Sequence, residues 1–203
     1  MSFDHYYSER PRAKLKLFKI ETTLRGFHLT FYTASGVFSP KRIDKGTRLL
    51  IESMIVKDGW RIMDLGTGYG PIGIVAAKLA PHGIVVMTDI NRRALWLARL
   101  NARINDVEEI VDIRFGSLYE PVRNEKFNTI ITNPPQSAGM STCIKIIQEA
   151  PRYLVSGGML QIVFRHSKGG SRLANVMKSV FGNCEVLASR SGYRVYVSVL
   201  ESE

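Results

Sequence analysis

Five short apolar segments alternate with helix-like segments between residues 61 and 181, and this alternation constrains the fold most. The strand candidates are RIMDL (61–65), IVVMTDI (84–90), VDIRF (111–115), FNTIIT (127–132) and MLQIVF (159–164). Helical patterns occupy the intervening segments near 71–80, 92–104 and 140–154, and another follows near 168–181. Near-continuous apolar strands that alternate with helices predict a doubly wound α/β fold, with a mostly parallel sheet covered by helices on both faces.

The two ends of the chain depart from this alternation. Near the C-terminus, CEVLASR and RVYVSVL flank the turn-like SGY with no helix between them, which predicts a hairpin and an antiparallel strand at the end of the sheet. At the N-terminus, residues 26–32 alternate like a strand, residues 33–36 are typical of a turn, and the following VF predicts a second short strand. A helix is expected over residues 44–57. We predict one domain, in which residues 1–43 form an extension with a β-hairpin and residues 44–203 form the main body.

Basic residues are concentrated in the two flanks of the chain. The formal net charge is +10, while residues 62–151 hold 9 basic and 9 acidic residues, so the excess lies outside this central part. A basic surface is typical of proteins that bind polyanions such as nucleic acids. No apolar run approaches the roughly 18–20 residues of a membrane span, and the N-terminus lacks the apolar region of a secretory signal. Cys143 and Cys184 form neither a disulfide framework nor a metal-ligand pattern. We expect a cytoplasmic, metal-free protein with no membrane partner.

A glycine-rich loop follows the first of the five strands, in the sequence DLGTGYGPIG that begins at Asp64. Glycines at such a turn let the backbone approach a ligand, and the following helix offers free N–H groups. A dinucleotide fingerprint would begin at Gly66 and continue through Gly68, but Pro71 then stands where the third glycine should be. A carboxylate at the strand end would repel a pyrophosphate, whereas it suits a ligand that carries an ammonium group. A glycine-rich turn without a ligand is the alternative.

Asp89 ends the second of these strands, 23 residues after Gly66. An acidic residue at this position can accept hydrogen bonds from both hydroxyls of an adenosine ribose. The alternative is that Asp89 caps the next helix, but Asn91 is an equally good cap and would leave Asp89 free. The strand FNTIIT is followed by Asn133, Pro134 and Pro135, which form either a rigid strand exit or a clamp for an amino group.

The order DLGTGYG, TDIN, NPP and terminal hairpin resembles the class I S-adenosylmethionine-dependent methyltransferases. The stretch SGVFSPKRIDKGTRLLIE (35–52) is similar to the corresponding segment of the small-subunit rRNA guanine-N2 methyltransferases, the methyltransferase small domain family. The resemblance covers roughly residues 26–200. Bacterial members carry two such halves, and this chain resembles the catalytic half alone, as in the single-domain archaeal type. It implies a seven-stranded, mostly parallel Rossmann-like sheet with a C-terminal antiparallel hairpin strand.

The resemblance implies that the cofactor is S-adenosyl-L-methionine. The glycine loop would wrap its methionine part while Asp64 orients the amino group, and Asp89 would hold the ribose while Ile90 packs on the adenine. Ser117 stands where the family usually shows an acidic residue, and the N–H of Leu118 would remain available to the adenine. The expected cofactor-binding residues are Asp64, Gly66, Thr67, Gly68, Tyr69, Gly70, Asp89, Ile90, Ser117, Leu118 and Asn133.

Asn133 and Pro134 are the expected catalytic residues. An exocyclic amine is a poor nucleophile because its lone pair is delocalised into the ring. The Asn133 side-chain oxygen and the Pro134 carbonyl would accept its two hydrogens, and in-line positioning would supply most of the catalysis. Phe38, Pro135 and Gln136 are the expected substrate-binding residues. Related enzymes often carry an aromatic residue where this chain has Gln136, so we look to Phe38 or Tyr69 for a stacking partner.

RNA is the expected partner, in the form of small-subunit rRNA or a ribosome assembly intermediate, and we expect a monomer or weak homodimer. The basic segments SPKRIDK (39–45) and RHSKGGSR (165–172) are expected to contact phosphates, and a paired base would have to be flipped out. The leading hypothesis is methylation of guanine N2. The alternatives are a protein glutamine N5-methyltransferase and a non-catalytic cofactor-binding or RNA-binding module. An NAD-dependent oxidoreductase is disfavoured by the glycine register.

Overall fold

The computed structural model describes residues 9, 11, 13–135 and 139–201. It contains two sheets, a two-stranded one near the N-terminus and a seven-stranded one. The strands are β1 (Leu17–Leu24), β2 (Phe27–Ala34), β3 (Arg61–Leu65), β4 (Ile84–Asp89), β5 (Val111–Phe115), β6 (Phe127–Thr132), β7 (Leu154–Arg165), β8 (Glu185–Arg190) and β9 (Tyr193–Val199). The helices are α1 (Lys45–Ser53), α2 (Pro71–Leu79), α3 (Arg92–Ile104), α4 (Met140–Glu149) and α5 (Gly170–Phe181), with 3-10 turns η1 (Glu120–Val122), η3 (Ala150–Tyr153) and η4 (His166–Lys168).

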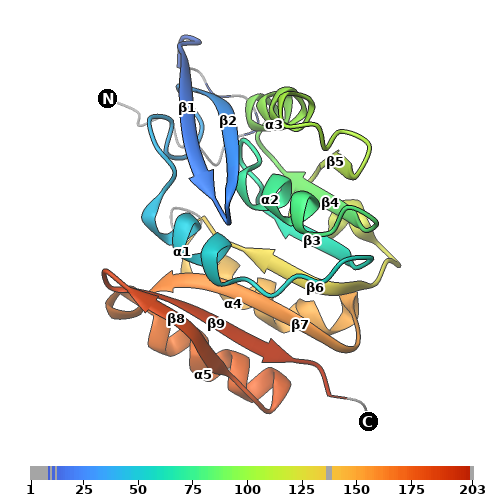
Figure 1. Ribbon diagram of the computed structural model, residues 1–203. Coiled ribbons are helices and arrows are strands. Elements are labelled where there is room, and N and C mark those ends of the chain that lie inside the picture. Colours follow the sequence, from blue (N-terminus) through green and yellow to red (C-terminus); the bar gives the residue numbers. More distant parts are fainter. Residues whose placement is uncertain (1–8, 10, 12, 136–138, 202–203) are drawn as a thin grey trace.

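The large sheet confirms the predicted doubly wound fold. Its strand order is β5-β4-β3-β6-β7-β9-β8, and β3 to β7 are parallel to their neighbours in this row. The terminal hairpin supplies β8 and β9, and β9 runs antiparallel to β7. Two apolar cores lie on the two faces of the sheet, one with side chains from α1, α2 and α3 and the other with side chains from α4 and α5. Figure 1 shows these two groups of helices on opposite faces of the sheet. The chain leaves β3 toward β4 and later returns to β6, so the strand order reverses at β3.

The N-terminal hairpin is formed by other residues than we predicted. β2 pairs with the preceding β1, in register from Leu17 opposite Ala34 to Leu24 opposite Phe27, while Val37 and Phe38 lie in a bend and form no strand. The intervening Arg25 and Gly26 have φ values of 51° and 83°. Two central residues with positive φ form the tight turn that suits the twist of a hairpin, and this turn determines the pairing.

Two asparagines of α3 attach this hairpin to the main body. Asn101 accepts from the backbone N–H of Tyr32 at 2.7 Å and donates to its carbonyl at 2.8 Å. Asn105, one helical turn later, makes the same pair of contacts with Thr30 at 3.2 and 2.8 Å. The carboxamides thus bind the free edge of β2 as a neighbouring strand would, so that its buried backbone groups are satisfied. The hairpin therefore belongs to the same packed unit as the sheet.

Several predicted boundaries shift by a few residues. α1 ends at Ser53, because the backbone that follows makes hydrogen bonds with the sheet and not with the helix. The Ile55 N–H donates to the buried Gln161 side chain on β7, and the Ile55 carbonyl accepts from the same side chain, each at 2.8 Å. The expected strand over 159–164 begins earlier, at Leu154, and the helix over 140–154 changes to a 3-10 turn at Ala150, next to Pro151. Across the described part of the chain, no helix has both the length and the apolar character needed to cross a membrane.

Candidate active site

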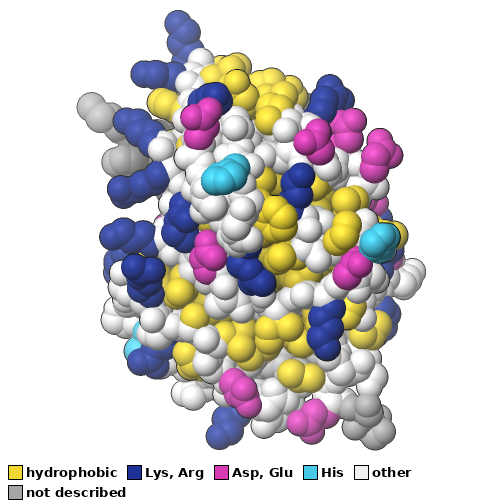
Figure 2. Space-filling view, viewed as in Figure 1, with side chains coloured by type: hydrophobic (Ala, Val, Ile, Leu, Met, Phe, Trp, Pro, Cys, Tyr) yellow, Lys and Arg dark blue, Asp and Glu magenta, His cyan; other side chains and the backbone are white. Residues whose placement is uncertain are grey.

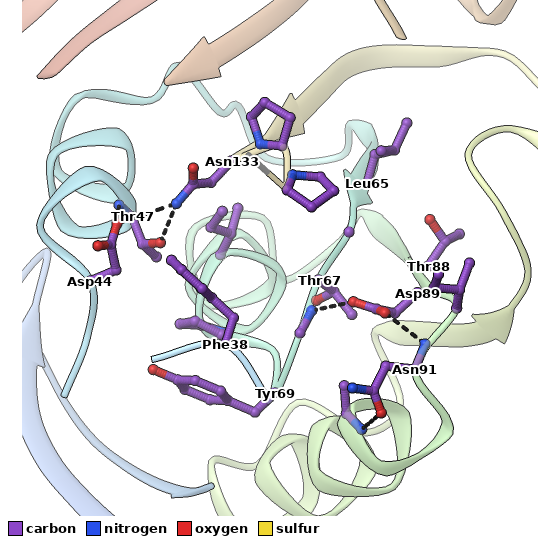
Figure 3. Close-up of a pocket in the computed structure, with 18 of the residues that line it drawn as sticks. Phe38, Asp44, Thr47, Leu65, Thr67, Tyr69, Thr88, Asp89, Asn91 and Asn133 are labelled. Carbon is purple, nitrogen blue, oxygen red and sulfur yellow. Dashed lines mark hydrogen bonds between the residues drawn. The ribbon is translucent and has the colours of Figure 1, made fainter. Parts of the chain in front are cut away.

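A pocket lies at the carboxyl ends of β3, β4 and β6, where the strand order reverses (Figure 3). In open α/β sheets this is the place where ligands bind. The lining residues come from the ends of β3 and β4, the segments after β3, β4, β5 and β6, the starts of α2 and α3, the segment before α1 and its first turn, and β9. They are Phe38, Asp44, Thr47, Leu65, Gly66, Thr67, Gly68, Tyr69, Pro71, Ile72, Thr88, Asp89, Ile90, Asn91, Ala94, Gly116, Leu118, Asn133, Pro134, Pro135 and Tyr193.

The glycine loop forms an open cradle on one side of the pocket. Gly66 and Gly68 have φ values of 76° and 59°, and a Cβ placed on either would meet no atom within 4 Å. Both residues line the pocket, so the space above their backbone is open to a ligand. The loop is held from below, because the N–H groups of Gly66 and Thr67 both donate to the Thr88 carbonyl at 2.9 Å. Gly70, also with positive φ, precedes Pro71 at the start of α2.

Asp64 lies beneath this loop and is not among the pocket-lining residues. Its Oδ2 accepts from the Thr67 hydroxyl at 2.5 Å and from the Gly73 N–H at 2.8 Å, while Oδ1 has no hydrogen-bond partner among the described residues. Burial raises the pKa of this carboxyl to about 7, and the negative charge of Asp89 acts in the same direction. In this structure Asp64 fixes the shape of the loop. Its expected contact with a ligand amino group stays a prediction.

Asp89 faces the pocket from the end of β4. Its Oδ2 accepts from the Gly68 N–H and its Oδ1 from the Asn91 N–H, both at 2.8 Å. A carboxylate has about four acceptor sites, so both oxygens retain capacity for donors of a ligand. Burial raises the pKa of Asp89, and the backbone N–H groups of Asn91 and Gly68 oppose that rise. Asn91 itself caps α3 by accepting from the N–H groups of Arg93 and Ala94, which leaves Asp89 in the position we expected (Figure 3).

The Asn133 side chain is oriented by the first turn of α1. Its Nδ2 donates to the Thr47 hydroxyl at 2.9 Å and to Asp44 Oδ2 at 3.3 Å (Figure 3). An ionised carboxylate can only accept hydrogen bonds, so the group that faces Asp44 must be the NH2 of the carboxamide. Asn133 Oδ1 accepts no hydrogen bond from the described residues. The arrangement therefore leaves an amide oxygen available beside the pocket.

The strand exit that carries Asn133 is fixed in place. The Thr132 hydroxyl donates to the Leu65 carbonyl at 2.7 Å, which joins the ends of β6 and β3. Pro134 is buried and Pro135 is half-buried, and both line the pocket. Proline has a restricted φ, so the two residues hold this backbone, and with it the Pro134 carbonyl, rigidly in place.

Three aromatic side chains line the pocket. Phe38 is 37% exposed, whereas Tyr69 and Tyr193 are 3% and 8% exposed. The ring of Tyr69 packs edge-on against Phe31, with 6.0 Å between centroids, and burial raises the pKa of its hydroxyl, so it stays neutral. Tyr193 packs against α1, since a Cβ on Gly46 would come within 2.9 Å of its ring. Phe38 is thus the most accessible of the three for a planar ligand.

Most of the predicted site residues come together, and a few lie apart. Gly70, Asp64 and Ser117 do not line the pocket, although the neighbours of Ser117 do. Gln136 lies outside the described residues. The predicted binding residues that line the pocket are Phe38, Gly66, Thr67, Gly68, Tyr69, Asp89, Ile90, Leu118, Asn133, Pro134 and Pro135.

Sequence reasoning assigned no role to Asp44, Thr47 and Tyr193. The first two lie within the DKGT stretch of the segment that resembles the family, so this segment contained a signal for them. Tyr193 follows the turn of the last hairpin, and nothing in the sequence around it indicates a binding site. Among the residues that the structure describes, no group of three or more His, Cys, Asp or Glu side chains could hold a metal ion.

Comparison with known proteins gives a consistent family match. The family model described as methyltransferase small domain matches residues 28–197. A protein of Bacillus subtilis (strain 168), named uncharacterized protein YbxB, is 35% identical over 196 residues, which cover 95% of this chain and 96% of that protein. The ribosomal RNA small subunit methyltransferase C of Haemophilus influenzae (strain PittGG) is 32% identical over 173 residues, which cover 83% of this chain and 51% of that protein. This chain thus spans about half the length of that enzyme.

Solved structures show the same fold. The Thermus thermophilus 16S rRNA N2 G1207 methyltransferase, in complex with AdoMet and guanosine, matches with a TM-score of 0.77 and 21% identity, covering 93% of this chain and 52% of that one. The RNA methyltransferase of Salinibacter ruber, in complex with S-adenosyl-L-homocysteine, matches with a TM-score of 0.57 and 19% identity, covering 79% of this chain and 94% of that one.

Proposed function

We propose that this chain, which belongs to the methyltransferase small domain family, transfers a methyl group from S-adenosylmethionine to an exocyclic amino group of a nucleobase in RNA. The target that we favour is N2 of a guanine in small-subunit rRNA. The observation that carries the proposal is the oriented Asn133 carboxamide, whose oxygen accepts no hydrogen bond from the described residues and lies next to Pro134, at the end of a pocket with a glycine cradle and an acidic residue.

The pocket fits S-adenosylmethionine by its shape and its donor and acceptor groups. The open backbone over Gly66 and Gly68 suits the methionine part, which must approach the chain closely. Asp89 retains acceptor capacity for the two ribose hydroxyls. Ile90 and Leu118 supply apolar surface for the adenine, and the backbone of Gly116 lines the pocket beside them. Asp64 acts from beneath the loop, and its contact with the cofactor amino group remains part of the proposal.

Asn133 and Pro134 provide the chemistry on the substrate side. The bound cofactor supplies a methyl group on an activated sulfonium. Asn133 Oδ1 and the Pro134 carbonyl each accept one hydrogen of the target amine, so that the nitrogen lone pair points away from both and toward the methyl donor. The nitrogen gains positive charge in the transition state, and these two fixed oxygens stabilise it without reorganisation. The Asp44 carboxylate behind the amide strengthens the effect because it polarises the carboxamide. The bond between sulfur and the methyl carbon would break as the bond from nitrogen forms, S-adenosylhomocysteine would leave, and the methylated nitrogen would lose one proton to water.

Phe38 is the proposed platform for the target base. Its ring lines the pocket and is accessible, so a base can stack on it while its amino group reaches Asn133. Pro135 would contact the base edge, and Gln136 is the further residue proposed to read it. The choice of guanine over adenine rests on the likeness to the Thermus thermophilus 16S rRNA N2 G1207 methyltransferase, and not on a contact of this pocket.

The direct test is methyl transfer with labelled S-adenosylmethionine. The purified protein is expected to label 16S-type rRNA or an assembly intermediate, and mass spectrometry of the digested RNA would identify the modified nucleotide. The Asn133→Ala variant is expected to lose transfer while it still binds the cofactor in calorimetry. Label that appears in a release-factor protein and not in RNA would refute the rRNA proposal and support a glutamine N5-methyltransferase. Cofactor binding without any transfer would support a non-catalytic module.

A further inference from the structure

Two arginines flank a pocket residue across three neighbouring strands. Tyr193 on β9 pairs with Arg165 on β7 and with Arg190 on β8, so the three residues form one row across the sheet. Directly paired residues of a sheet point to the same face. Because the Tyr193 ring packs against Gly46 at the start of α1 and lines the pocket, this is the face that borders the pocket. The Arg165 guanidinium lies 4.9 Å from the centre of the Tyr193 ring.

Three further cations belong to the segment that crosses the same side of the pocket. Phe38 and Asp44 line the pocket, and between them Lys41 and Arg42 carry exposed side chains. Lys45 follows as the first residue of α1 and is also exposed. Ser39 holds this segment in shape, since its hydroxyl donates to the Arg42 carbonyl at 2.6 Å.

Together these five cations form a surface that we call the basic rim: Lys41, Arg42, Lys45, Arg165 and Arg190. The packing of α1 on Tyr193 brings these residues, which are far apart in the sequence, to the Asn133 side of the pocket mouth. Asp44 is the acid among them, and its Oδ2 is engaged by the α1 backbone and by Asn133. The two basic segments that the sequence singled out are therefore joined into one surface.

Within residues 13–135 and 139–201, none of the five cations of the basic rim forms an ion pair with a carboxylate. The charge of Asp44 acts on Arg165 without forming such a pair. Arginines near β5 behave differently, since Arg103 pairs with Glu108 at 2.9 Å and Arg114 pairs with Asp112 at 2.6 Å. Figure 2 shows dark-blue side chains gathered along the left side, from the β1–β2 hairpin down to the β8–β9 turn. This side has positive charge available for an anionic partner.

We propose that the basic rim binds the backbone phosphates of the RNA strand on either side of the target nucleotide, which enters the pocket unpaired. The proposal rests on the function proposed above. An amino group that reaches Asn133 requires its base to leave the helical stack, and the adjacent phosphates then lie at the pocket mouth. If each of the five cations neutralises one phosphate of a single strand, the logarithm of the affinity falls with the logarithm of the salt concentration with a slope of about −3.5.

The test compares matched charge-removal variants. One rim pair is Lys41→Gln with Lys45→Gln, and the second is Arg165→Gln with Arg190→Gln. The control pair is Lys57→Gln with Lys126→Gln, because both lysines are exposed and precede β3 and β6, at the edge of the sheet opposite the pocket. Fluorescence anisotropy measures the affinity of each protein for a labelled single-stranded rRNA fragment over a series of KCl concentrations. Calorimetry with S-adenosylmethionine checks that the pocket is intact.

Each rim pair is expected to reduce the salt slope by about 1.4, since about 0.7 is lost per phosphate contact, while the control pair leaves it unchanged. The proposal would be overturned if the rim variants bound RNA with the same salt slope as the control variant. It would also be overturned if the rim and control variants lost RNA affinity equally. If either of these results is obtained and the wild-type protein still methylates RNA, the proposed function holds and only the role of the basic rim is refuted. If the wild-type protein transfers no methyl group to RNA but only the rim variants lose salt-dependent binding, the surface stands and the proposed function falls. If the rim variants lost binding to an acidic peptide but kept their binding to RNA, the basic rim would be assigned to a protein partner and the proposal that it binds RNA would be refuted.

Discussion

Replacing Thr47 by valine tests whether the orientation of the Asn133 carboxamide controls methyl transfer. Valine has nearly the same shape as threonine but lacks the hydroxyl that accepts from Asn133 Nδ2 at 2.9 Å. Thr47 is buried, with 5% of its surface exposed, and it sits in the first turn of α1 where the Asp44 cap remains. The substitution therefore removes one contact of the amide and leaves the helix in place.

The expected loss follows from the two contacts that hold the amide. A neutral hydrogen bond contributes about 0.5–1.5 kcal/mol, and the remaining contact to the Asp44 carboxylate still opposes a flip of the amide. A loss of about 1 kcal/mol in the preference for the active orientation lowers kcat about fivefold. Asp44→Asn removes the charged acceptor but keeps a good helix cap, so its loss is larger, at about tenfold or more.

Steady-state kinetics with labelled S-adenosylmethionine measures these effects. We expect kcat to fall for Thr47→Val, with little change in KM for RNA and in the Kd of the cofactor. Thr47→Ser restores the hydroxyl and is expected to restore kcat. A thermal melt of each variant reports whether the fold is intact. Unchanged kcat in Thr47→Val would refute the orienting role, as would a serine variant that is as slow as the valine variant.

Three further outcomes follow from the site. Asn133→Ala is expected to lower kcat by about 10²-fold or more, because one fixed partner of the reacting group is lost, while calorimetry shows unchanged cofactor binding. Asp89→Ala is expected to weaken the cofactor Kd about tenfold or more, since hydrogen bonds to a charged group contribute about 1.5–3 kcal/mol; an unaltered Kd would remove Asp89 from the ribose site. The folded protein without cofactor is expected to lose stability as the pH rises from about 4 to about 7. Burial raises the pKa of Asp64 to about 7, from about 3.9 in the unfolded chain, so between about pH 4 and about pH 7 the folded state binds this proton more tightly than the unfolded state does. The protonated carboxyl therefore contributes its full share to the free energy of unfolding below about pH 4, and this share is lost as the pH rises to about 7. Asp64→Asn is expected to flatten this part of the melting-temperature profile, and an identical profile in both proteins would contradict the assignment.

Local pattern was sufficient to predict the main sheet. The bounds of β3, β5, β6 and α3 agree with the prediction, because each is a continuous periodic segment bordered by polar or turn residues. The hairpin was predicted, but its partner strand and its turn were placed wrongly, because the positive φ of Arg25, which creates the turn, carries no composition signal apart from the following Gly26. The end of α1 was misplaced because a buried side chain on β7, Gln161, draws the chain out of the helix.

Some features of the candidate site could be located in the sequence, and others depend on packing. The glycine loop, Asp89 and the Asn-Pro-Pro exit follow directly from the strands that precede them, so they could be located in the sequence and are brought together in one pocket. Strand ends in a parallel sheet meet at one edge whatever the details of packing. Asp64 lies within β3 as expected, but it does not line the pocket, and its cofactor contact stays a prediction. Its depth beneath the loop depends on how α2 packs over β3, which the sequence does not specify.

Short-range sequence pattern was enough to identify the groups that we propose for the chemistry, because it dictates the strands, the turns and the residues that follow them. The orientation of those groups depends on contacts between segments that are distant in the sequence. Asn133 meets Thr47 and Asp44 across 86 and 89 positions of the chain, and Arg165 meets the first turn of α1 through Tyr193. A carboxamide presents its oxygen or its NH2 according to the charge of its neighbours, and those neighbours exist only after α1 has packed against the sheet.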